Sequence, residues 1–154
     1  MVCATVIFLQ IYNFFSYFCN SNSTITMAQH NDIGKLGETL CREYLETKGF
    51  AILETNWRKG RYEVDIIAYK EGIIVFAEVK TRSRLDYGDP EEFVTLDKQR
   101  AYVRLADKYV VEHMREEEVR FDILSVAITG SDYHITHFEN AFTAAELSNI
   151  RRPK

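Results

Sequence analysis

The sequence predicts an α/β domain: a mixed β-sheet flanked by helices, in the order αβββαββ. The chain has 154 residues, 46% of them hydrophobic, so it can bury one substantial core. From Met27 onward, segments with helical spacing of apolar residues alternate with short runs rich in β-branched and aromatic residues. No linker, repeat or low-complexity stretch separates these segments, so residues 27–154 are expected to form a single domain.

Residues 1–26 differ in composition from the rest and are expected to lie outside the domain. The stretch is apolar but is interrupted by polar residues such as Gln10 and Asn13, and the first Asp, Glu, Lys or Arg in the chain is Asp32. A secretory signal needs a basic start, and a membrane anchor needs about 20 strongly apolar residues with flanking Lys or Arg. We expect that Met27 is the true start of the protein, and a weak membrane anchor is the alternative.

The first helix is expected over about residues 33–48. Asn31 or Asp32 can cap its amino end, because their short side chains accept hydrogen bonds from free backbone N–H groups. Apolar residues then recur at helical spacing, and Gly49 supplies a C-terminal stop.

Three strands follow, over residues 50–58, 62–69 and 72–81. Each run has strand length and is rich in apolar and β-branched side chains, so the three are expected to form a meander. A two-residue turn at Glu71-Gly72 would join the second strand to the third and fix their register.

The second half of the chain predicts one helix and two strands. After a polar loop, Thr95 can cap a helix that runs from Leu96 to about His113. Residues 119–128 and 132–138 are expected to be strands, and a short helical tail follows Thr143.

The predicted hairpin carries charged side chains where a core would normally place apolar ones. Side chains alternate faces along a strand, so the proposed turn places Asp65 opposite Glu78, and Glu63 opposite Lys80, on one shared face. Opposed carboxylates repel each other and lose hydration between apolar neighbours, which is costly unless a cation neutralises them. The alternative is a solvated face with a Glu63–Lys80 ion pair.

A hard divalent cation, Mg²⁺ or Mn²⁺, would satisfy these carboxylates. Mg²⁺ is typically held by one or two carboxylates and takes its other ligands from water and substrate phosphate. Asp65 and Glu78 are the expected ligands, helped by the Val79 carbonyl. Lys80 could then orient or deprotonate an attacking water and stabilise charge that develops on a phosphate. This combination indicates phosphodiester hydrolysis.

Glu38 on the first helix is a further candidate for the same site. Helical spacing places it on the same face as Cys41 and Leu45, a core-like face where a carboxylate needs a partner. It could reach the proposed metal site, and the alternative is a solvated glutamate on the helix surface.

Basic residues gather around the acidic strands although the whole chain is acidic. Nineteen basic and 23 acidic residues give a net charge of −4, so nucleic-acid contact would have to come from local patches. Two groups flank the proposed site and a third forms a stripe on the second helix: Arg58, Lys59 and Arg61; Lys80, Arg82 and Arg84; and Arg100, Arg104 and Lys108. The alternative is ordinary solvated charge.

Cysteine usage favours a reducing compartment. The three cysteines, Cys3, Cys19 and Cys41, are far apart and lack metal-binding spacing, so we expect a cytoplasmic protein without structural zinc. The sequence also lacks a G-x-x-x-x-G-K motif, so no nucleotide cofactor is expected.

In combination, these motifs resemble the YraN-like family of uncharacterised bacterial proteins, within the PD-(D/E)xK or restriction-endonuclease-like superfamily that includes Holliday-junction resolvases. The resemblance covers residues 27–142 and rests on the order and spacing of its segments: "GKLGE" at 34–38, "EVDIIA" at 63–68, "AEVKTR" at 77–82, "GDPEE" at 88–92, Lys98, "RFDIL" at 120–124 and "HFENAF" at 137–142. Tyr62 departs from the pattern, in which a glycine usually precedes E-x-D, and it could narrow access to the site.

The resemblance implies a restriction-endonuclease-like fold and a metal-dependent endonuclease that acts on DNA, with branched or recombining DNA as a candidate substrate. It implies metal ligation by Asp65 and Glu78, a catalytic Lys80 and a supporting acidic role for Glu38. Contacts with nucleic acid are expected from Arg58, Lys59, Arg61, Arg82, Arg84 and Lys98. A non-catalytic nucleic-acid-binding module of the same fold is the alternative function, and a homodimer is expected by analogy with junction-resolving proteins.

Overall fold

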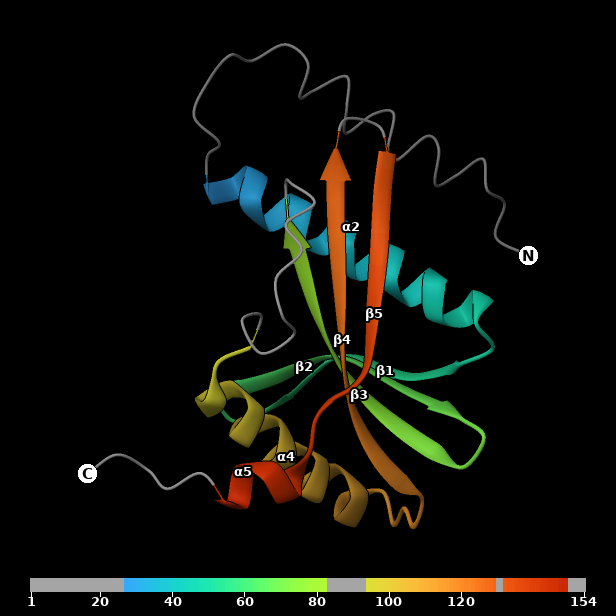
Figure 1. The fold of residues 1–154 in the computed structure, drawn as a ribbon, viewed down its shortest axis with the longest axis vertical. Helices are drawn as coiled ribbons and strands as arrows, with labels where there is room; N and C mark the ends of the chain where they lie inside the picture. Colours follow the sequence, from blue (N-terminus) through green and yellow to red (C-terminus); the bar gives the residue numbers. More distant parts are fainter. Residues whose placement is uncertain (1–26, 83–93, 130–131, 150–154) are drawn as a thin grey trace.

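The computed structural model describes residues 27–82, 94–129 and 132–149 (Figure 1). In chain order it contains α2 (Met27–Thr47), β1 (Ala51–Lys59), β2 (Tyr62–Lys70), β3 (Ile73–Arg82), α4 (Leu96–Glu112), β4 (Glu118–Thr129), β5 (Asp132–Phe142) and α5 (Ala144–Asn149). The predicted order αβββαββ and the short helical tail are confirmed. No helix in the described ranges is long and apolar enough to cross a membrane. The predictions for residues 1–26, for "GDPEE" and for Arg84 lie outside the described residues.

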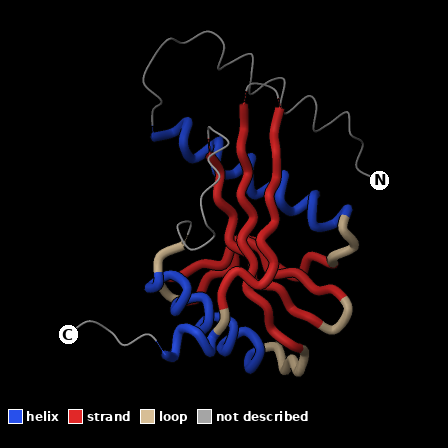
Figure 2. The backbone as a smooth tube through the Cα atoms, in the orientation of Figure 1, coloured by secondary structure: helices blue, strands red, loops and turns tan. Residues whose placement is uncertain are grey.

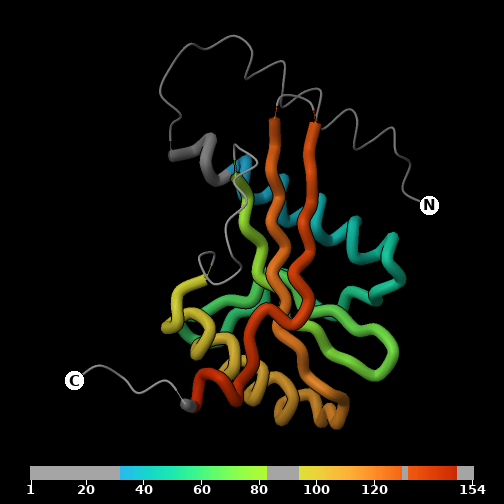
Figure 3. The backbone as a smooth tube through the Cα atoms, in the orientation of Figure 1, coloured from blue at the N-terminus to red at the C-terminus, as the bar shows by residue number. Residues whose placement is uncertain are grey.

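The five strands form one mixed sheet in the order β1-β2-β3-β4-β5. β3 and β4 run parallel, and all other neighbouring strands run antiparallel. The segment between the two parallel strands contains α4, as expected because parallel strands need a long crossover connection. Figure 3 shows β3 lying beside β4 in the twisted sheet.

Helices cover both faces of the sheet. On one face, α2 packs Leu40, Cys41 and Leu45 against apolar side chains of β2, β3 and β4. On the other face, α4 packs Tyr102 and Tyr109 in a second apolar cluster, which also includes side chains of all five strands and of α5. Figure 2 shows α2 passing behind the long strands and α4 lying together with α5 below them.

α2 begins earlier than the sequence predicted. The helix starts at Met27, so Asn31 and Asp32 lie inside it, and the prediction that one of them caps it is wrong. The residues that precede Asn31 include no Gly or Pro, so nothing local stops the helix from extending past the capping signal. The predicted end is confirmed, because Gly49 follows the helix with a φ of 85°.

The β2–β3 hairpin has the predicted two-residue turn. Glu71 and Gly72 have φ values of 50° and 84°, and positive φ at both central residues is characteristic of a type I′ turn. The turn places Ile67 opposite Phe76, which is the register expected from the sequence.

α2 approaches β3 closely at Gly37. A Cβ atom added there would lie 1.9 Å from the Thr81 hydroxyl oxygen and 3.1 Å from Thr81 Cβ. A larger residue would therefore push the helix away from the strand that carries Glu78 and Lys80. A Cβ atom added at Gly34, about one turn earlier, would have no other atom within 4 Å. Packing therefore requires the second glycine of "GKLGE" and not the first.

A buried carboxylate ties β4 to the end of β5. Asp122 is fully buried and accepts hydrogen bonds from Arg120 Nε and Nη2 at 2.9 and 2.8 Å. It also lies 2.8 Å from His137 Nε2 and accepts a bond from the Asn140 N–H at 2.9 Å. The motifs "RFDIL" and "HFENAF" thus meet in one cluster that anchors two strands, and β4 in turn flanks β3.

Candidate active site

Asp65 lies where the β2–β3 hairpin opens. The backbone ladder between the two strands extends from the turn to Ile66 opposite Ala77. Beyond that pair, the Val79 N–H donates to the Asp65 carboxylate at 2.8 Å. The N–H and C=O groups of one strand residue point to the same edge, so the Val79 carbonyl faces β2 as well. The Asp65 side chain thus occupies a position where backbone pairing would otherwise continue.

Glu78 is buried, with 1% of its surface exposed, and three side chains hold its carboxylate. Lys80 Nζ lies 2.7 Å from Oε1, and Lys98 Nζ donates to the same oxygen. The Tyr102 hydroxyl donates to Oε2. Lys80 belongs to β3, whereas Lys98 and Tyr102 belong to α4, so α4 completes the site that the hairpin begins.

Burial and neighbouring charges shift the pKa values of Asp65 and Glu78 in opposite directions. Burial raises the pKa of Asp65, and the charge of Glu78 raises it further, to about 7. Burial also disfavours ionised Glu78, but the charges of Lys98 and Lys80 outweigh it, and the pKa of Glu78 lies below its ordinary value. Burial followed by the Glu78 charge raises the pKa of Tyr102 well above its usual range, so its hydroxyl remains a donor. Near neutral pH, Asp65 can hold a proton while Glu78 stays charged.

Glu38 lies close to Asp65 but is not in the Glu78 cluster. It is partly buried and accepts a hydrogen bond from Asn56 Nδ2 at 3.1 Å. It lines a cavity of about 670 Å³ together with Asp65, and its charge is among the causes of the raised Asp65 pKa. The structure therefore brings Glu38 from α2 to the same region as the hairpin carboxylates.

Glu63 does not pair with Lys80. It lies opposite Arg58 across β1 and β2, and its Oε2 is 2.8 Å from Arg58 Nη2. The predicted Glu63–Lys80 opposition is wrong because the β2–β3 ladder ends before these residues, and this part of β2 follows β1 instead. Lys80 is left to contact Glu78 on its own strand.

Several of the predicted nucleic-acid contacts are engaged within the protein. Arg58 pairs with Glu63, and Lys59 Nζ lies 2.6 Å from Glu112 Oε2. Lys98 pairs with Glu78, and its side chain, which is 39% exposed, also lines an open cavity. Arg82 is partly exposed at the end of β3.

The sequence missed Tyr102 and placed Lys98 in a different role. A tyrosine on the apolar face of an amphipathic helix is normally a core residue, and Tyr102 does pack in the core while its hydroxyl reaches Glu78. The available signal was spacing: residues four apart share one helix face, so Lys98 and Tyr102 project from α4 in the same direction. The sequence could not predict the path of the β3–β4 connection, which places this face of α4 against Glu78.

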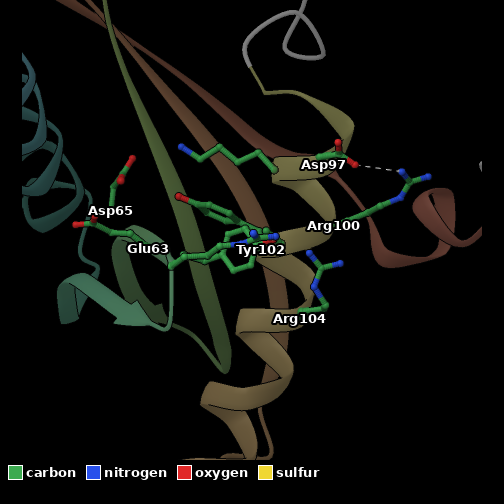
Figure 4. A pocket seen from close by; sticks show the side chains of 10 residues that line it. Glu63, Asp65, Asp97, Arg100, Tyr102 and Arg104 are labelled. Carbon is green, nitrogen blue, oxygen red and sulfur yellow. Dashed lines mark hydrogen bonds and ion pairs between the residues drawn. The ribbon is translucent and has the colours of Figure 1, made fainter. Parts of the chain in front are cut away.

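Two cavities meet at Glu63 and Asp65. The larger, of about 1080 Å³, is lined by β2 and α4, and the one lined by Glu38 is bounded by β2 and α2. Figure 4 shows the larger cavity, with Glu63 and Asp65 on the β2 side and Tyr102 and Arg104 on the α4 side. Asp65 is thus accessible from two hollows that lie on either side of it.

The fold defines an α/β protein with a mixed sheet between helices, and two carboxylates and a lysine lie where its β2–β3 hairpin opens. The sequence model of the "Uncharacterised protein family UPF0102" matches residues 37–126. The chain belongs to this family, which is the YraN-like family.

Curated relatives match most of the chain. A UPF0102 protein of Flavobacterium psychrophilum is 48% identical over 116 residues, which are 75% of this chain and 98% of the relative. A UPF0102 protein of Bacteroides thetaiotaomicron is 45% identical over 116 residues, with 75% and 96% covered. One from Dictyoglomus turgidum is 41% identical over 116 residues, with 73% and 98% covered. The names of these three relatives state no activity.

Proposed function

We propose that the protein is a metal-dependent endonuclease that hydrolyses phosphodiester bonds in DNA, with branched or recombining DNA as the favoured substrate. The observation that carries the proposal is the hydrogen bond from the Val79 N–H to Asp65, which places this carboxylate beside the strand segment that carries Glu78 and Lys80. Asp65 also lines two open cavities, and the Glu78 charge acts on it. Carboxylates and lysine in this combination suit a cation-assisted attack of water on phosphate.

We propose Mg²⁺ or Mn²⁺ as the cofactor of this site, and the chemistry of its oxygen donors supports the proposal. Burial and the Glu78 charge raise the pKa of Asp65 to about 7, and a cation beside both carboxylates would favour their ionised forms. Asp65, Glu78 and the Val79 carbonyl are hard oxygen donors, and Mg²⁺ commonly uses few protein ligands of this kind. When bound, the cation would supply positive charge to the phosphate under attack.

The remaining side chains have distinct proposed roles. Lys80 holds Glu78 and is 33% exposed, so its ammonium can orient an attacking water and stabilise charge on the phosphate. Tyr102 positions the Glu78 carboxylate from the core side. Glu38 supports the site from α2 by adding negative charge near Asp65.

A non-catalytic nucleic-acid-binding module is the second candidate. Lys80 and Lys98 already neutralise Glu78, so the carboxylate is satisfied without a metal ion. Thermal unfolding with and without Mg²⁺ or Mn²⁺ separates the two candidates, since a ligand of the folded state raises the melting temperature. The endonuclease should be stabilised by the metal and Asp65→Asn should abolish the effect, whereas the binding module should show no metal effect.

The endonuclease proposal is tested by a cleavage panel. Linear, flapped and four-way DNA are incubated with purified protein and Mg²⁺ or Mn²⁺, and with chelator as the control. We expect metal-dependent cleavage, with the branched substrates cut faster than the linear one. Absence of cleavage on every substrate with both metals would contradict the endonuclease and favour the binding module.

A further inference from the structure

Three side chains form an exposed cationic cluster at the mouth of the larger cavity. Tyr62 begins β2, and its hydroxyl accepts a hydrogen bond from Arg61 Nη2 at 2.7 Å. The Arg61 guanidinium carbon lies 4.9 Å from the centre of the Tyr62 ring. The Arg104 guanidinium carbon, which comes from α4, lies 5.7 Å from the same ring centre. Tyr62 thus holds two arginines from different elements near each other.

The charges of this cluster are not balanced from within the described residues. Among them, neither Arg61 nor Arg104 forms an ion pair with a carboxylate, whereas Arg58 and Lys59 both do. Two guanidinium groups near one ring repel each other, so bringing in an anion would be favourable. The pKa of Tyr62 is lowered by its hydrogen bond to Arg61 and then by both arginine charges, which is consistent with a local positive potential.

The location of the cluster relates it to the candidate active site. Arg61, Tyr62 and Arg104 line the same cavity as Asp65. The charged lining of that cavity has four basic side chains, Arg61, Lys98, Arg100 and Arg104, and three acidic ones, Glu63, Asp65 and Asp97. The cavity on the other side of Asp65 has two basic side chains, Lys35 and Arg58, and three acidic ones, Glu38, Glu63 and Asp65. An anionic chain that reaches Asp65 would therefore meet more positive charge on the α4 side.

We infer that Arg61, Tyr62 and Arg104 bind a backbone phosphate of the DNA strand that enters the site, next to the bond that is cut. The inference rests on the proposed function and deepens it by placing the substrate on the α4 side of Asp65. Guanidinium groups suit this ligand because they remain charged and offer paired donors to phosphate oxygens. Contacts of this kind fix the position of the strand and do not read its sequence. Tyr62 gains a role in this inference, since its ring and hydroxyl contact the two arginines.

Binding of labelled duplex DNA, measured by fluorescence anisotropy in chelator over about 50 to 200 mM salt, tests the inference without cleavage. The double variant Arg61→Gln, Arg104→Gln should bind roughly tenfold or more weakly, and its log-log salt slope should become shallower by about 0.9 for each phosphate that the protein no longer neutralises. The matched control is Arg42→Gln, Lys48→Gln, which removes the same charge from two exposed positions on and just after α2, outside the lining of both cavities. The control should bind within about twofold of the parent.

The outcomes distinguish this inference from the proposed function. Equal affinities and salt slopes for the parent and both double variants would overturn the inference, and so would a parent protein that binds no DNA. A parent that binds through the cluster but cuts no substrate in the panel would keep the inference and refute the endonuclease. A parent that cuts DNA, with KM unchanged in Arg61→Gln, Arg104→Gln, would keep the endonuclease and refute the cluster.

Discussion

Glu78 is the residue on which the candidate active site converges. Its Oε1 atom contacts the ammonium groups of Lys80 and Lys98, and its Oε2 atom accepts a hydrogen bond from the Tyr102 hydroxyl. Asp65 has a different environment, since its carboxylate accepts a backbone N–H and its pKa is raised by burial and by Glu78. If Asp65 and Glu78 held a divalent cation, Glu78 would also remain in contact with Lys80 and Lys98.

Lys98→Met should strengthen divalent-cation binding. The Lys98 ammonium neutralises Glu78, a proposed ligand of the cation, so its removal leaves more negative potential at the site. We expect Mg²⁺ or Mn²⁺ to bind roughly tenfold more tightly to the variant, which corresponds to about 1.4 kcal/mol, as measured by isothermal titration calorimetry. The matched control is Lys108→Met, which removes the same charge from the same helix outside the cavity lining. Weaker metal binding in Lys98→Met would mean that Lys98 supports the metal site instead of competing with it.

Asp65 should make the metal-free protein less stable as pH rises toward neutrality. Its pKa is about 7 in the folded protein against an ordinary value of 3.8, so between these values the folded state binds more protons than the unfolded state. Stability therefore falls with rising pH in this window, by up to about 1.4 kcal/mol per pH unit for one proton. Urea unfolding in chelator at pH 5 and pH 7 should show Asp65→Asn gaining stability relative to the parent at the higher pH. A stability difference that does not change with pH would contradict the raised pKa.

Individual site residues differed in how far the sequence could predict them. Asp65, Glu78 and Lys80 could be found because strand alternation and a two-residue turn bring them to one end of a hairpin. The hydrogen bond from the Val79 N–H to Asp65 could not be predicted from the sequence, because the prediction assumed that the backbones of β2 and β3 stay paired at these residues. Tyr102 was missed because its ring belongs to the core and only its hydroxyl belongs to the site.

Among the elements, α2 has the tightest positional requirement. It carries Glu38 toward Asp65, and its approach to β3 depends on the absence of a side chain at Gly37. α4 contributes in a different way, by directing Lys98 and Tyr102 onto Glu78 from the opposite face. The site is therefore sensitive to the spacing of two helices against one strand.

Gly37→Ala should destabilise the protein, whereas Gly34→Ala should not. The added methyl group at Gly37 would overlap Thr81, and relief of such overpacking typically costs about 1–3 kcal/mol, partly offset by up to about 1 kcal/mol of improved helix propensity. Gly34→Ala has open space and gains only the propensity term. Urea unfolding of both variants measures the difference. Equal stability of the two variants would show that α2 and β3 adjust to the extra methyl group without cost.

The sequence predicted turns and helix ends correctly where a few adjacent residues determine them. The Glu71-Gly72 turn and the Thr95 cap were predicted and are present, because each depends on a few adjacent residues. The start of α2 was wrong, because a capping residue does not stop a helix whose preceding residues also favour it. The Glu63–Lys80 opposition was wrong, because it depends on where two strands separate.

At the scale of the whole molecule, the chain order determines which surfaces meet. The αβββαββ order places α2 and α4 on opposite faces of one sheet, and the parallel β3–β4 pair holds the charged end of β3 between them. This arrangement could be predicted as a class, since alternating helices and strands favour a mixed sheet between helices. The side chains that α4 adds to the site depend on the twist of the sheet and on the path of the β3–β4 connection, and no local sequence pattern specifies either.

The rate at which Lys80→Ala cleaves DNA tests the central claim most directly. If Lys80 acts on the attacking water and phosphate, the variant should retain its fold and DNA affinity but lose about 100-fold or more of the metal-dependent cleavage rate in single-turnover assays. Glu78→Ala should be inactive as well, and both variants are compared with the parent at equal amounts of folded protein. If Lys80→Ala and Glu78→Ala both cut as fast as the parent, the result would contradict an active site at the β2–β3 hairpin. The cleavage would then belong to another protein in the preparation.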